Sequence, residues 1–253
     1  MAEGVQNGLL RAVQVARETA VHRAPNGIAY GAFGDNSLEG RDLERIVQAV
    51  PSAIAAALAR KAYYFVPLAL SEGRTGDSTL VAPAYTTELG DQATCHRNVT
   101  LDDADGVFIS TRLLGDRFAL SFEFFINVAH AFVDVTGVPD SFQQLAWSQA
   151  VARVRGETSQ DAWESRNLSF SGKSDSPDIV DERAKTSFLE SAFSDSIAIY
   201  LLSLAIDFDY TELREREYPL LAPQALGERL RLVGKLFPPN AGYEFAVRYR
   251  RRA

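Results

Sequence analysis

Two histidines, a cysteine and an aspartate carry the residue types and spacing that could bind a metal ion. His130 and Asp134 are four residues apart, so on a helix both side chains would project from one face and could reach the same ion. Cys95 and His96 stand upstream, where a loop could supply a further ligand. Such a ligand set suits zinc or iron. The competing interpretation is that His130 is partly buried and hydrogen-bonded to its neighbour, with Asp134 at the surface.

Glu123 and His130 are the candidate catalytic residues. A carboxylate in a partly apolar cleft could have a perturbed proton affinity and act as a general base, which is the role considered for Glu123. The competing interpretation for Glu123 is an ion pair on a sheet face, with Arg112 within reach. His130 could act as a base for Cys95. His96 is a poor base for Cys95, because adjacent residues of an extended chain point to opposite sides.

Familiar catalytic and nucleotide-binding motifs are not found in the sequence. Residues 171–174 read Ser-Gly-Lys-Ser, as at the end of a phosphate loop, but Asn167 stands where the first glycine of that motif belongs. There is no Gly-x-Gly-x-x-Gly, no Gly-x-Ser-x-Gly and no His-Glu-x-x-His sequence. The motifs therefore indicate no named enzyme class.

A β-hairpin is the clearest element expected to position these residues. Residues 107–114 and 117–125 flank Gly115 and Asp116, and a two-residue loop with glycine first suits a type II′ turn. One register then places mostly apolar residues on a common face, pairing Val107 with Phe124, Ile109 with Phe122, Thr111 with Leu120 and Leu113 with Phe118. The sequence predicts this hairpin, followed by a short helix from about residue 126.

A helix over residues 117–134 is the alternative for the second half of that segment. It would align four polar residues on one stripe at spacings of four, three and four, namely Glu123, Asn127, His130 and Asp134. In that case the stripe becomes the place to look for activity.

The fold class predicted from the remaining patterns is α+β, with an antiparallel sheet around the hairpin packed by several helices. We expect strands at 63–70, 79–86 and 243–249, and helices at 4–23, at 41–62 with a break at Pro51, and at 140–155, 188–206 and 223–236. Residues 1–253 are expected to form one domain. The loop at 167–181, rich in Ser, Asp, Gly and Pro, is the candidate internal boundary.

Composition limits the cellular compartment and the classes of binding partner that we expect. The formal net charge of −7 offers no positive field for nucleic acid, and the basic cluster at residues 248–252 is interpreted as a solvated chain end. Cys95 is the sole cysteine, so no intramolecular disulfide exists. The acidic N-terminus lacks a signal-peptide pattern, and the longest strongly apolar stretch, 197–206, is about half the length that crosses a bilayer. A soluble, cytoplasmic protein without membrane contact is expected.

Two functions remain open at this point. The first is a small-molecule or metal site near His130, Asp134 and Glu123. The alternative is a non-catalytic binding or assembly protein that acts through self-association or a protein partner. The apolar helix expected at 188–206 could then serve as the interface of a homo-oligomer.

Overall fold

The chain forms two compact units, Met1–Asn127 and Val128–Ala253. The computed structural model describes residues 8–36, 38–72, 78–102, 104–114, 116–170, 180–210, 213 and 218–247. The division falls inside helix α5, Arg117–Thr136. It does not coincide with the loop predicted as a boundary, of which residues 171–179 lie outside the described part. That the whole chain acts as one domain stays a prediction.

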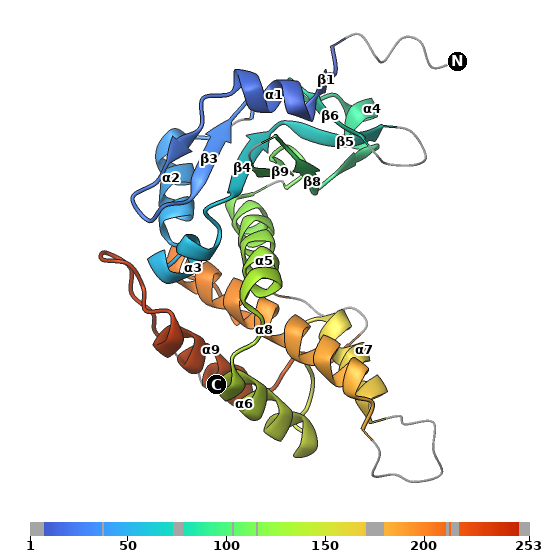
Figure 1. The fold of residues 1–253 in the computed structure, drawn as a ribbon, viewed down its shortest axis with the longest axis vertical. Coiled ribbons are helices and arrows are strands. Elements are labelled where there is room, and N and C mark those ends of the chain that lie inside the picture. Colours follow the sequence, from blue (N-terminus) through green and yellow to red (C-terminus); the bar gives the residue numbers. More distant parts are fainter. Residues whose placement is uncertain are drawn as a thin grey trace. The chain divides into compact units, whose positions relative to one another are not determined.

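The first unit contains two β-sheets and the short helices around them (Figure 1). Its strands are β1 Leu10–Arg11, β2 His22–Arg23, β3 Ala29–Ala32, β4 Lys61–Val66, β5 Leu68–Glu72, β6 Ser78–Ala82, β7 Ala93–Thr94, β8 His96–Thr100 and β9 Asp105–Ser110. Its helices, besides the first part of α5, are α1 Ala12–Glu18, α2 Gly40–Gln48, α3 Ser52–Ala57 and α4 Thr87–Gly90. One sheet has the order β1-β6-β5-β7 and is antiparallel. The other has the order β2-β3-β4-β9-β8 and is mixed, because β3, β4 and β9 run parallel.

Both faces of the mixed sheet are covered, which explains its apolar central strands. On one face Tyr64 and Phe108 stack at 4.7 Å and belong to a core cluster with Val15 of α1 and Val81 of the other sheet. On the opposite face Tyr63 meets the ring of Phe124 from α5 edge-on at 5.0 Å. Alternate residues of β4 therefore serve the two sides of the sheet, as the two-residue period of a strand requires.

The α+β class is confirmed, but the predicted hairpin is wrong. Strand β9 does contain Val107, yet it pairs in parallel with β4 and antiparallel with β8. Residues 117–125 belong to α5, where the buried side chains of Leu120, Phe124 and Val128 recur every four residues. Helix burial thus accounts for the apolar residues that were assigned to the second strand, and the alternative helix is the one found. Gly115 of the expected turn lies outside the described residues.

The second unit is helical. Besides the later part of α5 it contains α6 Asp140–Val151, α7 Gln160–Ser169, α8 Glu182–Ala205 and α9 Pro223–Leu236. Figure 1 shows α8 running through the middle of this unit, with α6, α7 and α9 around it. The prediction that 188–206 is buried is confirmed, since Phe188, Phe193 and Ile197 are fully covered. The apolar surface considered for a homo-oligomer interface is therefore used inside the unit.

Two described helices, α5 and α8, are long and apolar enough to cross a membrane by length and composition. From the sequence, only the shorter run at 197–206 was considered for this role. Within the structure, 56% of the apolar window of α5 and 83% of that of α8 is buried. Core helices of soluble proteins pass the same test, so burial is sufficient to explain this apolar composition.

Several smaller predictions are corrected. Of the helix predicted at 4–23, the described residues are helical only over α1, because residues 10–11 pair with β6 and residues 22–23 with β3; residues 4–7 lie outside the described part. The break at Pro51 is confirmed and separates α2 from α3. Residues 243–247 form no strand; Phe245 instead meets the ring of Tyr200 edge-on at 5.0 Å.

Candidate functional site

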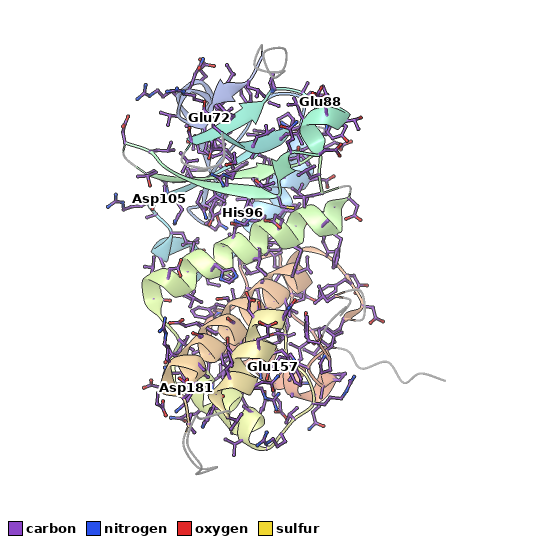
Figure 2. All side chains as sticks on the ribbon, turned by 90° about the vertical axis from the view of Figure 1, so that its right-hand side faces the viewer. Glu72, Glu88, His96, Asp105, Glu157 and Asp181 are labelled. Atoms are coloured by element: carbon purple, nitrogen blue, oxygen red, sulfur yellow. The ribbon has the colours of Figure 1, made fainter. Side chains whose placement is uncertain are left out.

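In the first unit, Glu123 pairs with His96. The Nδ1 atom of His96 lies 2.6 Å from Oε1 of Glu123, and Asn127 donates to the same oxygen at 3.2 Å. The predicted partner Arg112 is not involved, because its guanidinium binds Asp35 at 2.5 Å. Figure 2 marks His96, whose side chain is 39% exposed. The carboxylate of Glu123 therefore orients an accessible imidazole, which is a positioning arrangement known from catalytic and metal sites.

Cys95 beside this pair is poorly suited to nucleophilic chemistry. The residue is exposed. Partial burial of the thiol raises its pKa, and the negative charge of Glu123 raises it further, against a backbone hydrogen bond that lowers it. Since the thiolate is the reactive form, a raised pKa reduces the reactive fraction at neutral pH.

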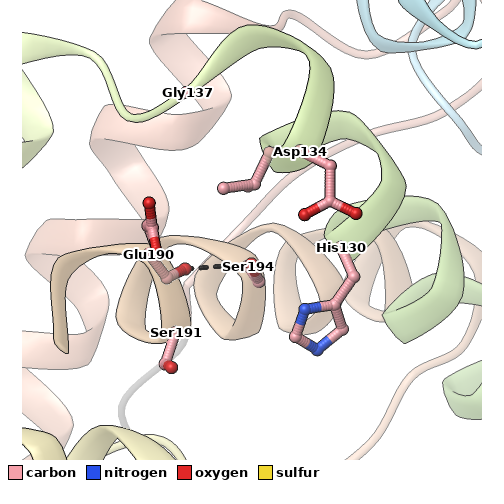
Figure 3. A pocket seen from close by; sticks show the side chains of 7 residues that line it. His130, Asp134, Gly137, Glu190, Ser191 and Ser194 are labelled. Carbon is pink, nitrogen blue, oxygen red and sulfur yellow. Dashed lines mark hydrogen bonds between the residues drawn. The ribbon is translucent and has the colours of Figure 1, made fainter. Parts of the chain in front are cut away.

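In the second unit, His130 and Asp134 line a pocket of about 420 Å³. Figure 3 shows both side chains on one side of α5, facing residues of α8. The full lining is His130, Val133, Asp134, Gly137, Glu190, Ser191 and Ser194. Its volume falls within the range of small-molecule sites, about 300–1,000 Å³.

The helical spacing of the residues on α5 and on α8 explains why these side chains line one pocket. His130 and Asp134 are one turn apart on α5, and Glu190 and Ser194 are one turn apart on α8. Beyond α5, Gly137 has a φ of +69°, and its N–H donates to the carbonyl oxygen of Val133 at 2.8 Å. This left-handed cap ends the helix beside the pocket and adds no side chain to it.

Asp195 follows the pocket residue Ser194 and is almost fully buried, at 6% exposure. Burial raises the pKa of Asp195 from 3.8 to about 6. Hydrogen bonds from Ser159 and Thr158 and the charges of His130 and Arg229 act in the opposite direction. Thr158 donates its hydroxyl to Oδ2 at 2.8 Å. A buried carboxylate that changes charge near pH 6, within the electrostatic reach of a pocket histidine, is a candidate acid–base group.

Glu157 anchors a buried ion cluster in the same unit (Figure 2). Its two oxygens accept from Arg166 at 3.0 Å and from Arg229 at 2.9 and 3.3 Å. Arg229 also donates to Gln149 at 2.8 Å. Arg229 also lowers the pKa of Asp195, so its charge acts on both of these buried carboxyl groups.

The predicted metal ligands come from both units. Cys95 and His96 belong to the first unit, and His130 and Asp134 to the second. Within the described ranges, no group of three or more His, Cys, Asp or Glu side chains could hold a metal ion. The zinc or iron hypothesis therefore gains no support from the structure. The predicted catalytic pair is also divided, with Glu123 beside His96 and His130 in the pocket.

Asp195, Glu190 and the two pocket serines were not predicted from the sequence. One signal was present: residues 194–196, Ser-Asp-Ser, interrupt the apolar part of α8. A carboxylate inside a buried helix has to find polar partners or take up a proton, so its position alone marks it as unusual. Its partner Thr158 could not be inferred, because it is 37 residues away in the chain.

Comparison with known proteins gives no identification: no family model, no curated protein and no solved structure matches this chain. The function therefore has to be inferred from the geometry of the two sites.

Proposed function

We propose that this chain is a small-molecule-binding protein whose ligand occupies the pocket lined by His130, Asp134, Glu190, Ser191 and Ser194. The observation that carries the proposal is the convergence of these polar groups from two helices on one concave site. Pockets with a few convergent polar groups and a titrating residue nearby are the usual location of ligand sites. The buried apolar helices and the lone cysteine support a soluble, cytosolic setting for it.

The pocket is better suited to binding than to covalent catalysis. The hydroxyl of Ser194 donates to the carbonyl oxygen of Glu190 at 2.9 Å, so its proton is engaged within the helix (Figure 3). The imidazole of His130, the carboxylates of Asp134 and Glu190 and the hydroxyl of Ser191 offer hydrogen bonds to a bound molecule. This lining indicates a polar ligand of low molecular weight.

Nuclear magnetic resonance of the histidine rings tests the proposal. The chain has three histidines, so their signals can be assigned by single substitutions. We expect members of a fragment library with neutral, anionic and cationic compounds to shift the ring signals of His130 and to leave those of His96 in place. Asp134→Asn and Ser191→Ala should each weaken such binding about tenfold, equivalent to about 1.4 kcal/mol.

Glu164→Gln is the matched control, because Glu164 is exposed on α7 and does not line the pocket. It should leave the affinity unchanged. If no fragment shifts His130, or if hits bind the pocket variants as tightly as the unchanged chain, the proposed function is wrong.

A further inference from the structure

The charges of the pocket indicate the chemical class of its ligand. The lining holds two carboxylates, Asp134 and Glu190, on facing helices, and the described lining residues include no lysine or arginine. Both carboxylates are exposed, as is His130. Asp195, the residue after Ser194 of the lining, adds a third carboxyl group, which is buried and interacts electrostatically with His130. An anion would meet repulsion from each of these groups, whereas a cation would be attracted.

The remaining lining groups favour an organic cation over a metal ion. The side-chain oxygens and the imidazole do not form a cluster that could coordinate a metal within the described chain. The pocket volume of about 420 Å³ exceeds what a single ion needs, and Val133 offers a small apolar contact. An alkylammonium group fits this combination, because it donates hydrogen bonds to carboxylate and hydroxyl oxygens and carries a short apolar stem.

Resting on the proposed function, we infer that the ligand is a small alkylamine in its ammonium form, and that the charge state of Asp195 adjusts its affinity. Ionised Asp195 adds negative potential behind the pocket and strengthens binding. Protonated Asp195 removes that potential and weakens binding. The residue acts through the field at the pocket and touches no ligand atom, so it is a positioning residue.

The groups packed around Asp195 set the direction of the pH dependence. His130 on α5 and Arg229 on α9 both lower the pKa of Asp195, while Thr158 and Ser159 give it hydrogen bonds. Arg166 on α7 forms an ion pair with Glu157 at 3.0 Å. Acidification therefore protonates Asp195, and the loss of its negative charge weakens the attraction for a bound ammonium group.

Four-carbon compounds of equal length provide the test. The probes are 1,4-diaminobutane, 4-amino-1-butanol, 1,4-butanediol and succinate, titrated at pH 7.5 with the His130 ring signals as readout. We expect the diamine to bind most tightly and each replacement of an ammonium by a hydroxyl to weaken binding roughly fivefold. Succinate should not bind. Tighter binding by succinate or the diol than by the diamine overturns the inference, yet leaves the pocket function standing.

Asp195→Asn tests the role of Asp195. This isosteric change should weaken diamine binding about tenfold at pH 7.5 and flatten the loss of affinity between pH 7.5 and pH 5. Retained circular dichroism and a retained cooperative urea unfolding transition exclude misfolding of the variant, and Glu164→Gln is the control. An Asp195→Asn variant with unchanged affinity and unchanged pH profile overturns the role of Asp195. If no probe and no fragment reaches His130, the proposed function itself fails.

Discussion

Two carboxylates lie buried in the second unit with different surroundings. Glu157 is 0% exposed and accepts hydrogen bonds from two guanidinium groups, those of Arg166 and Arg229. Asp195 is 6% exposed and accepts hydrogen bonds from neutral hydroxyls, including that of Thr158. The described hydrogen bonds of Arg229 all go to Glu157 and Gln149, so Asp195 receives only its more distant field. Burial alone thus does not decide whether a carboxylate is structural or titratable; the counter-charge in contact with it does.

Removing the charge of Glu157 should have the largest effect. Glu157→Gln leaves two guanidinium groups without their carboxylate, and Arg229 is 0% exposed. We expect a loss of about 3–5 kcal/mol in the free energy of unfolding, because an unpaired buried charge is costly. Urea unfolding at pH 7.5 measures it.

Glu182→Gln is the control for this change, since Glu182 forms an exposed ion pair with Lys185. It should cost less than about 1 kcal/mol. Equal losses for the two variants would remove the distinction drawn between Glu157 and ordinary surface carboxylates.

Asp195 should show the opposite behaviour, a stability that depends on pH. Its pKa is about 6 in the folded chain and 3.8 when unperturbed, so the folded state holds an extra proton between these values. That stabilising contribution is present below about pH 4 and is lost as the pH rises through 6. Asp195→Asn should therefore gain about 2–3 kcal/mol relative to the unchanged chain on going from pH 4 to pH 8.

Urea unfolding of both chains at the two pH values measures this gain. Asp161→Asn, an exposed position on α7, is the control and should show no such trend. A constant difference between Asp195→Asn and the unchanged chain across the pH range would mean that folding does not raise the pKa of Asp195.

The sequence predicted the elements whose signal is local. The break at Pro51, the start of α9 at Pro223 and the buried second half of α8 are consequences of proline geometry and apolar composition. The strand predicted at residues 117–125 was wrong. Over this short stretch the apolar residues alternate as in a strand, whereas over the whole of residues 117–136 the chain forms a helix. Strand β9 finds its partners in β4 and β8, and the pairing with β4 joins residues more than forty positions apart. No local pattern encodes that choice.

The candidate site was predicted only in part, for a related reason. His130 and Asp134 were recognisable because one helix turn separates them, and the alternative helix placed them on one stripe. Their partners Glu190 and Ser194 come from another helix about sixty residues downstream, and no spacing rule links the two segments. The pairing of Glu123 with His96 was hidden by the wrong register assumed for residues 117–125.

The smallest expected effect is that of the hydroxyl of Thr158. Thr158→Val keeps the shape of the side chain and removes the hydrogen bond to Oδ2 of Asp195. Because this bond stabilises the ionised form, its loss should raise the pKa of Asp195 further and cost about 1 kcal/mol at pH 8 but less at pH 4. A carbon-13 titration of the Asp195 carboxyl signal measures the pKa. Thr186→Val, an exposed hydroxyl on α8 that bonds only its own helix, is the control. A lower pKa in Thr158→Val would show that the hydroxyl stabilises the protonated carboxyl group. The hydrogen bond from Thr158 would then not be what favours the ionised form of Asp195.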